Sequence, residues 1–449
     1  MADYVQSGIP FYRSKEIIEK SNNQPVSTDI FITCEHFDKI KMKFGAPEAG
    51  DILLTSVGTL GVSYQVSDDD LFYFKDGNLT WFRNFNNRVL SGYIYCWLKS
   101  PSARKKLDEI SIGTTQRALT IASLKKILIK IPSLDVQKKI VFIYESLSKK
   151  IINNGKINQT LEQMAQVLFK SWFVDFEPVK AKIAVLEAGG SQEDATRAAM
   201  TAISGKDADA LAVFEREHPE QYAQLKATAE LFPAAMQDSE LGAIPKGWGV
   251  ASISEMGKVT CGKTPSKKEP EYYGSDVPFI KIPDMHGQLF VLKTNEYLSE
   301  AGSKSQLKKL VPANSICVSC IATIGVVSIT NEPSHTNQQI NSVTPHKSSL
   351  LYYLYFCMLG LKDHLHILGS AGSATLNVNT STFSGIKIAQ PDAKVLELFH
   401  AKCTHLFNEI KSLSVQTESL TQLRDTLLPK LLSGEITLPE AEQIISEEA

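Results

Sequence analysis

The chain lacks long hydrophobic runs, and it lacks a leader with a charged start and an apolar centre. A membrane-spanning helix needs about 18 or more consecutive apolar residues, and a charged-then-apolar leader is the mark of secretion. We therefore expect no membrane span, no secretion and a cytoplasmic location. At 449 residues the chain is long enough for two or three domains.

Cysteine is sparse, with seven residues scattered along the chain. Cys317 and Cys320 form a lone CxxC inside an apolar stretch that is typical of a strand. A metal or redox site would need a second Cys or His pair at a suitable spacing, and the nine histidines do not cluster. We interpret these cysteines as buried thiols in a reducing compartment and expect no metal site.

An excess of basic residues is also missing, since the formal net charge is −2. Residues 1–178 carry 23 Lys and Arg against 19 Asp and Glu, and residues 246–434 carry 18 against 14. Residues 179–245 carry 6 against 11, and residues 435–449 carry five acids and no base. Two mildly basic segments thus alternate with two acidic ones. The basic segments permit contact with phosphates without requiring it.

The chain does contain an internal repeat. GIPFYRSKEI at 8–17 matches DVPFIKIPDM at 276–285, and TSVGTLGVS at 55–63 matches SCIATIGVVS at 319–328. KILIKIPSLDVQKKI matches GIKIAQPDAKVLELF, so Pro132 corresponds to Pro391 at an offset of 259 residues. Solenoid repeats have periods of about 20–50 residues. Two copies of this length instead predict two similar domains and a pseudo-symmetric protein with a two-part target.

Each of these prolines precedes apolar residues in alternating steps of three and four, which is typical of a coiled-coil seam. The second run is Leu396, Phe399, Cys403, Leu406, Ile410, Leu413, Thr417, Leu420, Arg424, Leu427 and Leu431. The first run, at the same offset, has polar steps at Asn154 and Asn158, and a buried Asn fixes register at a cost in stability. Each helix would be on the order of 60 Å long. We predict an antiparallel pair that acts as a rigid spacer; the alternative is two unrelated amphipathic helices on separate cores.

Three segments carry a family resemblance. FKSWFVDFEPVKAK at 169–182 and LTQLRDTLLPKLLSGEI at 420–436 resemble the central and C-terminal conserved regions of the specificity subunits of type I restriction-modification systems. DSELGAIPKGW at 238–248 resembles the usual entry into their second target recognition domain. The resemblance implies that each recognition domain reads one half of a bipartite DNA sequence. It also implies that the two conserved helices set the gap between the halves and dock the methyltransferase subunits.

The expected fold is α+β: two similar α/β target recognition domains joined by a long antiparallel coiled coil, with pseudo-two-fold symmetry. We expect a first domain at 1–131, a long helix at 132–178, a helical acidic connector at 179–237, a second domain at 238–390, a second long helix at 391–434 and an acidic tail at 435–449. The second domain has 38 residues before its VPFIKI segment and the first has seven before GIPFYR. The first domain is therefore expected to lack an opening strand and loop.

One stretch has the spacing of a nucleotide-binding loop, since Gly257–Thr264 matches GxxxxGK[ST]. Such a loop needs a buried strand before it and a helix after it, so that backbone N–H groups converge on phosphate. Pro265 and Pro270 leave no room for that helix. We favour a polar loop between short strands. The sequence has no adenine-methyltransferase N/D-P-P-aromatic motif, no convincing ATPase motif and no nuclease carboxylate–lysine set, so we expect no enzyme activity.

Base edges and phosphates are contacted by Arg, Lys, Asn, Gln and Ser or Thr, and both copies concentrate such residues at corresponding places. The candidates in the first copy are Arg13, Ser14, Lys15, Ser56, Thr59, Asn78, Arg83, Thr114, Thr115, Gln116 and Arg117. Those in the second copy are Lys263, Thr264, Ser266, Lys267, Lys281, Asp284, Thr323, Asn337, Gln338, Gln339, Ser370 and Ser373.

The resemblance implies that the long helices dock partner subunits. The residues assigned to pairing and docking are Leu147, Ile151, Leu161, Leu168, Phe169, Trp172, Phe173, Leu406, Ile410, Leu420, Leu427 and Leu431. We expect a non-catalytic reader of double-stranded DNA with two methyltransferase subunits, and restriction subunits attached through them. This chain would hold no cofactor, while S-adenosylmethionine and ATP with Mg would bind the partners. The alternatives are a nucleotide-dependent DNA-processing protein using Gly257–Thr264 and a coiled-coil adaptor without a DNA role.

Overall fold

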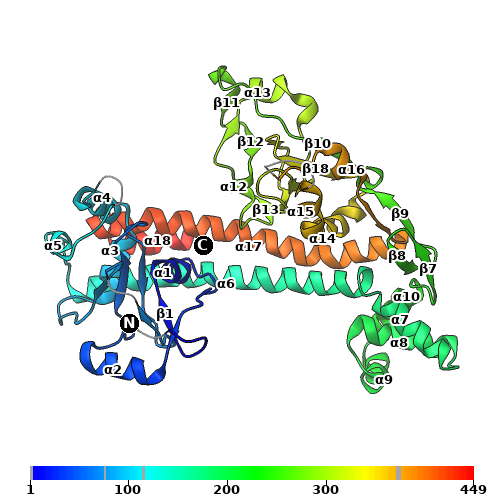
Figure 1. Cartoon of the computed structure of the whole chain (residues 1–449), viewed down its shortest axis with the longest axis horizontal. Helices are drawn as coiled ribbons and strands as arrows, with labels where there is room; N and C mark the ends of the chain where they lie inside the picture. Colours follow the sequence, from blue (N-terminus) through cyan, green and yellow to red (C-terminus); the bar gives the residue numbers. More distant parts are fainter. Residues whose placement is uncertain (1–3, 75–76, 114–116, 371–375, 449) are drawn as a thin grey trace. The chain divides into compact units, whose positions relative to one another are not determined.

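The computed structural model describes residues 4–74, 77–113, 117–370 and 376–448 (Figure 1). These residues form two compact units, one of 1–156 with 413–449 and the other of 157–412. Both units mix helices with short strands, as the predicted α+β class requires. No described helix is both long and apolar enough to cross a membrane.

The first mixed domain lies in the first unit, and its short strands are followed by three helices. Its elements are β1 (Ile9–Tyr12), α1 (Ser14–Ser21), β2 (Phe31–Ile32), α2 (Cys34–Phe44), β3 (Ile52–Thr55), β4 (Ser63–Gln65), β5 (Tyr73–Phe74), β6 (Leu79–Phe82), α3 (Ser91–Lys99), α4 (Pro101–Ile110) and α5 (Ile121–Leu124). Among the described residues the strands order as β2-β1-β5 and β4-β3-β6. Ile52, Leu54 and Trp97 are buried in one core that joins the second sheet to the helices.

The second unit opens with a helical insert. Helices α7 (Glu177–Glu187), α8 (Gln192–Ser204), α9 (Ala208–Glu217) and α10 (Pro219–Glu230) follow one another along the chain. Gly205 ends α8 in a left-handed conformation, φ 68°, which glycine adopts without steric cost. Ala199, Met200 and Leu211 form a small core of their own. Lys182 is buried and donates to the Phe232 carbonyl at 2.6 Å.

The insert leads into the second mixed domain. Its elements are β7 (Met236–Ser239), β8 (Gly242–Pro245), β9 (Gly249–Ser252), α11 (Ile253–Met256), β10 (Gly257–Cys261), β11 (Tyr273–Gly274), β12 (Val277–Ile280), α12 (Ile282–Met285), β13 (Phe290–Val291), β14 (Tyr297–Leu298), α13 (Glu300–Ser305), β15 (Ile316–Ser319), β16 (Val327–Thr330), β17 (His335–Thr336), β18 (Ile340–Pro345), α14 (Leu351–Gly360), α15 (Lys362–Ser370), α16 (Thr380–Gly385) and β19 (Lys387–Gln390). Short 3₁₀ turns lie at Pro270–Tyr272, Leu307–Lys309 and Ser348–Leu350.

The strand pairing repeats between the two mixed domains. β1 pairs antiparallel with β2 and parallel with β5, and β12 pairs antiparallel with β14 and parallel with β17. β3 lies between β4 and β6, as β15 lies between β16 and β18. The predicted internal repeat is therefore confirmed at the level of topology. In the described residues the second domain has additional strands, because β10 extends its larger sheet beyond β18 and β13 extends it beyond β16.

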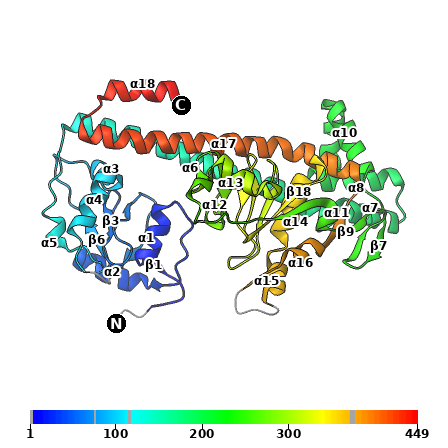
Figure 2. The same cartoon turned by 90° about the horizontal axis from the view of Figure 1, so that it is seen from above.

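The two long helices are α6 (Leu134–Phe173) and α17 (Ala393–Ser433), which run side by side (Figures 1 and 2). In the first unit Leu147 of α6 shares a core with Leu420 and Leu427 of α17. In the second unit Leu161 and Leu168 of α6 pack on the core that contains Ile410. The start of α6 thus meets the end of α17, which confirms the antiparallel coiled coil.

Each long helix is followed by a residue with a left-handed backbone conformation, which ends it. After α6, Phe176 takes a left-handed conformation, φ 54°, and Pro178 lies in the first turn of α7. After α17, Gly434 has φ 78°, a conformation in which glycine commonly terminates helices. A last helix, α18 (Leu438–Glu448), follows, and its Ala441 is buried in the core of the first unit.

Candidate DNA interface

In the second domain, two loops that are far apart in sequence form one polar surface. Lys263 and Thr264 follow β10, whereas Gln338 follows β17. The Thr264 hydroxyl donates to Gln338 Oε1 at 2.6 Å, and the Lys263 N–H donates to the Thr336 carbonyl at 2.9 Å. The structure thus brings together residues that sequence reasoning assigned separately.

A close backbone contact and hydrogen bonds from buried side chains hold the same two loops in place. A Cβ on Gly262 would lie 2.2 Å from the Asn337 carbonyl oxygen, so the two backbones approach too closely for another residue. Buried Gln306 donates from Nε2 to the Lys263 carbonyl at 3.0 Å. The Asn337 side chain is also nearly buried and donates to Gln339 Oε1 at 2.9 Å. The backbone of both loops is therefore held in place, while the exposed side chains of Lys263 and Gln338 are accessible to a ligand.

A buried histidine lies behind this surface. His335 Nε2 and Ser303 Oγ are 2.9 Å apart, and Gln306 Nε2 is 3.5 Å from His335 Nδ1. Burial lowers the pKa of His335 to about 4, because desolvation disfavours the charged ring. The neutral ring is thus a packing and hydrogen-bonding group and not a candidate phosphate contact.

Exposure separates the residues that can meet a ligand from those that cannot. Lys263, Ser266, Lys267 and Gln338 are exposed. Lysine is suited to phosphate, and glutamine can read adenine through paired hydrogen bonds. We call Lys263, Thr264, Ser266, Lys267 and Gln338 the β10–β17 surface. These residue types are the ones that contact phosphates and base edges in protein–DNA complexes.

Two other candidates of this domain are engaged with the protein. Asp284 is 4% exposed and accepts from the Lys281 N–H at 2.9 Å and from Asn295 Nδ2 at 2.6 Å. Its carboxylate thus caps α12 and fixes a neighbouring loop. Lys281 forms an ion pair with Glu296. Both side chains are thus already engaged in contacts around α12.

The remaining candidates of the second domain lie elsewhere. Thr323 is exposed in the turn between β15 and β16, beside Ala322 at φ 65°. Ser370 is exposed at the end of α15, where its hydroxyl donates to the His366 carbonyl at 2.7 Å. Ser373 falls outside the described residues.

In the first domain Arg13 and Lys15, two of the candidates around α1, are already paired with acidic residues. Arg13 Nη2 lies 2.8 Å from Glu16 and 3.4 Å from Asp29. Its hydrogen bond to Glu16 raises the pKa of Arg13. Ser14 is half-buried, and exposed Lys15 lies 3.8 Å from Glu19.

The other candidates of the first domain differ in accessibility. Ser56 is buried and hydrogen-bonded to the Leu54 carbonyl and to Thr80, and Asn78 is half-buried. Thr59 is exposed in the turn equivalent to that of Thr323. Arg117 is exposed and forms an ion pair with Asp108 at 3.1 Å. Thr114, Thr115 and Gln116 fall outside the described residues.

Arg83 belongs to a basic surface that sequence reasoning missed. Its guanidinium lies 4.0 Å from the centre of the Trp81 ring and donates to the Phe44 carbonyl at 2.8 Å. Phe44 ends α2, which carries exposed Lys39, Lys41 and Lys43. The signal was the alternation of lysine with apolar residues in KIKMKF, including Met42 at 90% exposure.

The nucleotide-loop alternative is not favoured by the local structure. Gly257–Cys261 is itself strand β10, paired with β18 along its length. The described chain continues from Thr264 into a short 3₁₀ turn at Pro270–Tyr272, not into a helix whose N-terminus could receive phosphate.

The CxxC cysteines lie inside the protein. Cys317 and Cys320 are both buried. Burial raises the pKa of each thiol to about 11, which keeps both protonated and unreactive at neutral pH. Within the described residues no group of His, Cys, Asp and Glu is arranged to hold a metal ion.

Comparison with known proteins places this geometry in a family. Residues 4–163 and 245–412 match the type I restriction modification DNA specificity domain. The HindI type I specificity subunit of Haemophilus influenzae is 42% identical over 92% of this chain and 93% of its own length. The MjaIX specificity subunit of Methanocaldococcus jannaschii is 26% identical over 87% of this chain and 78% of its own length.

The fold is also similar to a solved structure. The S subunit of a type I restriction-modification system from M. genitalium has a TM-score of 0.50 at 14% identity, covering 95% of this chain and 90% of that one. The two matched stretches each contain one copy of the repeated strand scaffold. The chain therefore belongs to the family of type I restriction-modification specificity subunits, the non-catalytic subunits that recognise DNA.

Proposed function

We propose that this chain reads a bipartite site in double-stranded DNA, with one half-site contacted by each mixed domain. The observation that carries the proposal is the repeated strand scaffold, which presents exposed polar residues in both copies. In the second domain the β10–β17 surface would make the contacts. In the first domain Thr59, Arg83 and Arg117 remain candidates, joined by the lysines of α2.

The candidates engaged with the protein take supporting roles in this proposal. Asp284 and Ser56 would position loops instead of touching bases, because both are buried and hydrogen-bonded. Arg13 and Lys281 would reach phosphate only by exchanging their ion pairs with Glu16 and Glu296. Such contacts favour binding without selecting sequence.

We further propose that α6 and α17 set the distance between the half-sites and dock two methyltransferase subunits. Trp172 and Phe173 are buried, so they would shape the helices and not touch a partner. Exposed apolar residues on α6 are better placed for docking: Phe142 is 71% exposed, Met164 54% and Val167 68%. Aromatic residues and Met are enriched at such interfaces.

The complex would work in the cytoplasm, where restriction subunits would join through the methyltransferases. S-adenosylmethionine and ATP with Mg would bind those partners, which would supply the chemistry. This chain would supply sequence selection and geometry. The nucleotide-dependent enzyme and the adaptor without a DNA role are both less favoured, because the matched domain type is a DNA specificity domain.

A domain exchange tests the proposal. Residues 238–390 are replaced by the corresponding segment of a relative with a different target, and the hybrid is expressed with its methyltransferase partner in a host whose methylome is then sequenced. We expect one half-site to change while the other half-site and the spacer are kept. The matched control replaces residues 191–230, which contain α8, α9 and α10 of the helical insert, and is expected to leave both half-sites unchanged.

The outcomes separate the alternatives. A change in both half-sites after exchange of one domain would contradict independent reading. Unmodified DNA with assembled complex would support the adaptor. Saturable nucleotide binding by the pure chain that is lost in Lys263→Ala would support the enzyme.

A further inference from the structure

Met42 is the most exposed of the large apolar side chains that the structure describes, at 90%. It lies in the last turn of α2, between exposed Lys41 and Lys43. An apolar side chain of this size is stabilised by cover from water, and nothing in the described chain covers it. Single exposed apolar residues are nevertheless common on protein surfaces, so Met42 alone identifies no site.

The helices α2 and α13 occupy equivalent places in the two mixed domains. α2 follows β2, which pairs antiparallel with β1, and α13 follows β14, which pairs antiparallel with β12. Each helix is capped at its start by a side-chain hydroxyl. Each then contains a Glu–Lys ion pair, Glu35–Lys39 at 2.6 Å in α2 and Glu300–Lys304 at 2.9 Å in α13. The two ion pairs match at an offset of 265 residues.

The same offset maps Met42 onto Leu307, which is 59% exposed. It also maps Lys43 onto Lys308, and both of these lysines are exposed. α2 remains helical through this position, whereas Leu307 begins a short 3₁₀ turn after α13. The local backbone therefore differs between the two domains. An exposed apolar side chain followed by an exposed lysine nevertheless occurs at the equivalent place in both.

Both apolar residues are attached to well-supported parts of their domains. Arg83, just after β6, donates to the Phe44 carbonyl at 2.8 Å and so ties the end of α2 to the sheet. Leu307 directly follows buried Gln306, which donates from Nε2 to the Lys263 carbonyl at 3.0 Å. This hydrogen bond connects the 3₁₀ turn to a loop of the β10–β17 surface. Each apolar side chain thus projects from a supported backbone near residues proposed to contact DNA.

The neighbouring charges favour DNA over a protein as the ligand. Lys39 and Lys304 are paired with glutamates, whereas Lys41, Lys43 and Lys308 take part in no ion pair within the described chain. Lysine is depleted at protein–protein interfaces, but near DNA it binds phosphates and releases counterions. Proteins that bind the minor groove combine basic side chains with an inserted Met, Leu or Phe that partly unstacks one base step. Both domains also match a DNA specificity domain.

We propose that Met42 and Leu307 act as wedges, each of which enters the minor groove, partly unstacks one base step of its half-site and kinks the duplex there. This inference rests on the proposed function, since it assigns a role to residues near the surfaces proposed to contact DNA. The neighbouring lysines bind phosphates beside the unstacked step. A kink costs least at a flexible pyrimidine–purine step, so each wedge adds selectivity for such a step without a hydrogen bond to a base.

A bending measurement tests the proposal. The probe is a duplex that carries the bipartite site found by methylome sequencing, with a donor fluorophore at one end and an acceptor at the other. The full chain, assembled with its methyltransferase partner, is added to this duplex. We expect energy transfer to rise on binding, to rise less with Met42→Ala or Leu307→Ala, and least with the double variant. Each single variant should also weaken binding about tenfold, as for the loss of a buried apolar side chain.

Matched variants separate a wedge from a general loss of apolar surface. Leu71→Ala removes a leucine that is 58% exposed but follows three aspartates, and it should change neither bending nor affinity. Met42→Leu and Leu307→Met keep a large apolar side chain and should bend DNA as the parent does. Lys43→Ala should reduce the salt dependence of binding, which Met42→Ala should leave unchanged. All four positions are exposed, so circular dichroism should show the parent's fold in every variant.

The outcomes distinguish failure of this inference from failure of the proposed function. Weaker binding by the alanine variants with unchanged bending would indicate an apolar contact such as one with a thymine methyl group; it would overturn the wedge and leave DNA reading intact. Unchanged binding and bending in both alanine variants would do the same. Loss of the methyltransferase partner in size-exclusion chromatography would show that these residues dock a protein instead. If the parent complex bound no duplex, DNA reading and the wedge would both be wrong.

Discussion

Asn154 of α6 donates a hydrogen bond from Nδ2 to Gln416 Oε1 of α17 at 2.9 Å, and Asn154 is only 5% exposed. The two residues belong to the same compact unit. Their pairing crosses the coiled coil at one of the polar steps of an otherwise apolar seam. A buried amide pair of this kind specifies the register of two helices.

The first prediction concerns this pair. Gln416→Leu should lower the free energy of unfolding by about 1–3 kcal/mol, because it leaves the Asn154 amide buried without that partner. The double variant Asn154→Leu with Gln416→Leu should recover most of the loss. Urea unfolding of the two single variants and the double variant gives the coupling energy. Gln422→Leu, at an exposed position of α17, is the control. If Gln422→Leu lowered the free energy of unfolding as much as Gln416→Leu does, the prediction would be contradicted.

The second prediction tests the seam itself. Leu420 is 2% exposed in the core of the first unit, whereas Val415 on the same helix is 48% exposed. Leu420→Asp should lower the free energy of unfolding by about 3 kcal/mol or more, since it buries a charge without a partner. Val415→Asp should change it by about 0.5 kcal/mol or less. Comparable losses measured in urea would mean that the helices are not paired through Leu420.

The third prediction concerns the spacer. Seven residues with the same three-and-four apolar pattern are inserted into both helices, after Lys156 in α6 and after Ser412 in α17. Because the pairing is antiparallel, both insertions are needed to keep the seam in phase. The coiled coil should lengthen by about 10 Å, and the gap between half-sites by about three base pairs at about 3.4 Å each. Methylome sequencing reads the gap; an unchanged gap with full methylation would disprove the ruler role.

The fourth prediction separates base reading from phosphate contact. Gln338→Ala should cost about 1–3 kcal/mol of binding at one base pair of the second half-site and relax specificity there. Lys263→Ala should weaken binding to all sequences alike and reduce the salt dependence. Binding titrations against a panel of single-base variants at two salt concentrations distinguish these effects. Lys226→Ala, an exposed lysine of the helical insert, is the control and should change neither quantity.

The fifth prediction is a pH dependence. Burial lowers the pKa of His335 to about 4, below its value of about 6.5 in the unfolded chain. Between these values the unfolded state binds the proton and the folded state does not. Stability should therefore be full above about pH 6.5 and fall as the pH falls toward about 4. His335→Gln keeps a polar group near Ser303 and should make the urea midpoint less dependent on pH in this range. An unchanged pH dependence would show that His335 does not cause the loss of stability.

The sequence by itself determined the architecture of this protein. The repeat of GIPFYR in VPFIKI predicted equivalent strands, and β1 and β12 indeed have the same two kinds of neighbour. The three-and-four spacing predicted the coiled coil, because apolar residues at that spacing lie on one face of a helix. Such patterns are local, so they can be recognised without knowledge of distant contacts.

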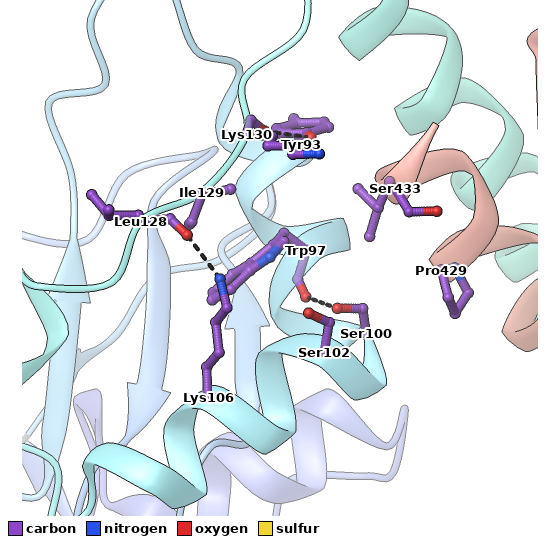
Figure 3. A pocket seen from close by; sticks show the side chains of 11 residues that line it. Tyr93, Trp97, Ser100, Ser102, Lys106, Leu128, Ile129, Lys130, Pro429 and Ser433 are labelled. Carbon is purple, nitrogen blue, oxygen red and sulfur yellow. Dashed lines mark hydrogen bonds between the residues drawn. The ribbon is translucent and has the colours of Figure 1, made fainter. Parts of the chain in front are cut away.

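Only the tertiary structure decided which polar residues are presented to a ligand. Asp284 and Ser56 have the same chemistry as residues that bind DNA, yet Asn295 and Thr80 use their hydrogen-bonding groups. Thr264 and Gln338, 74 positions apart, meet because β10 and β17 end near one another. A groove lined mainly by residues of the first domain, such as Trp97 and Leu128, is completed by Leu432 of α17, about 300 residues later in the chain (Figure 3). A side chain's exposure depends on partners that folding brings from distant positions, and no local pattern encodes that.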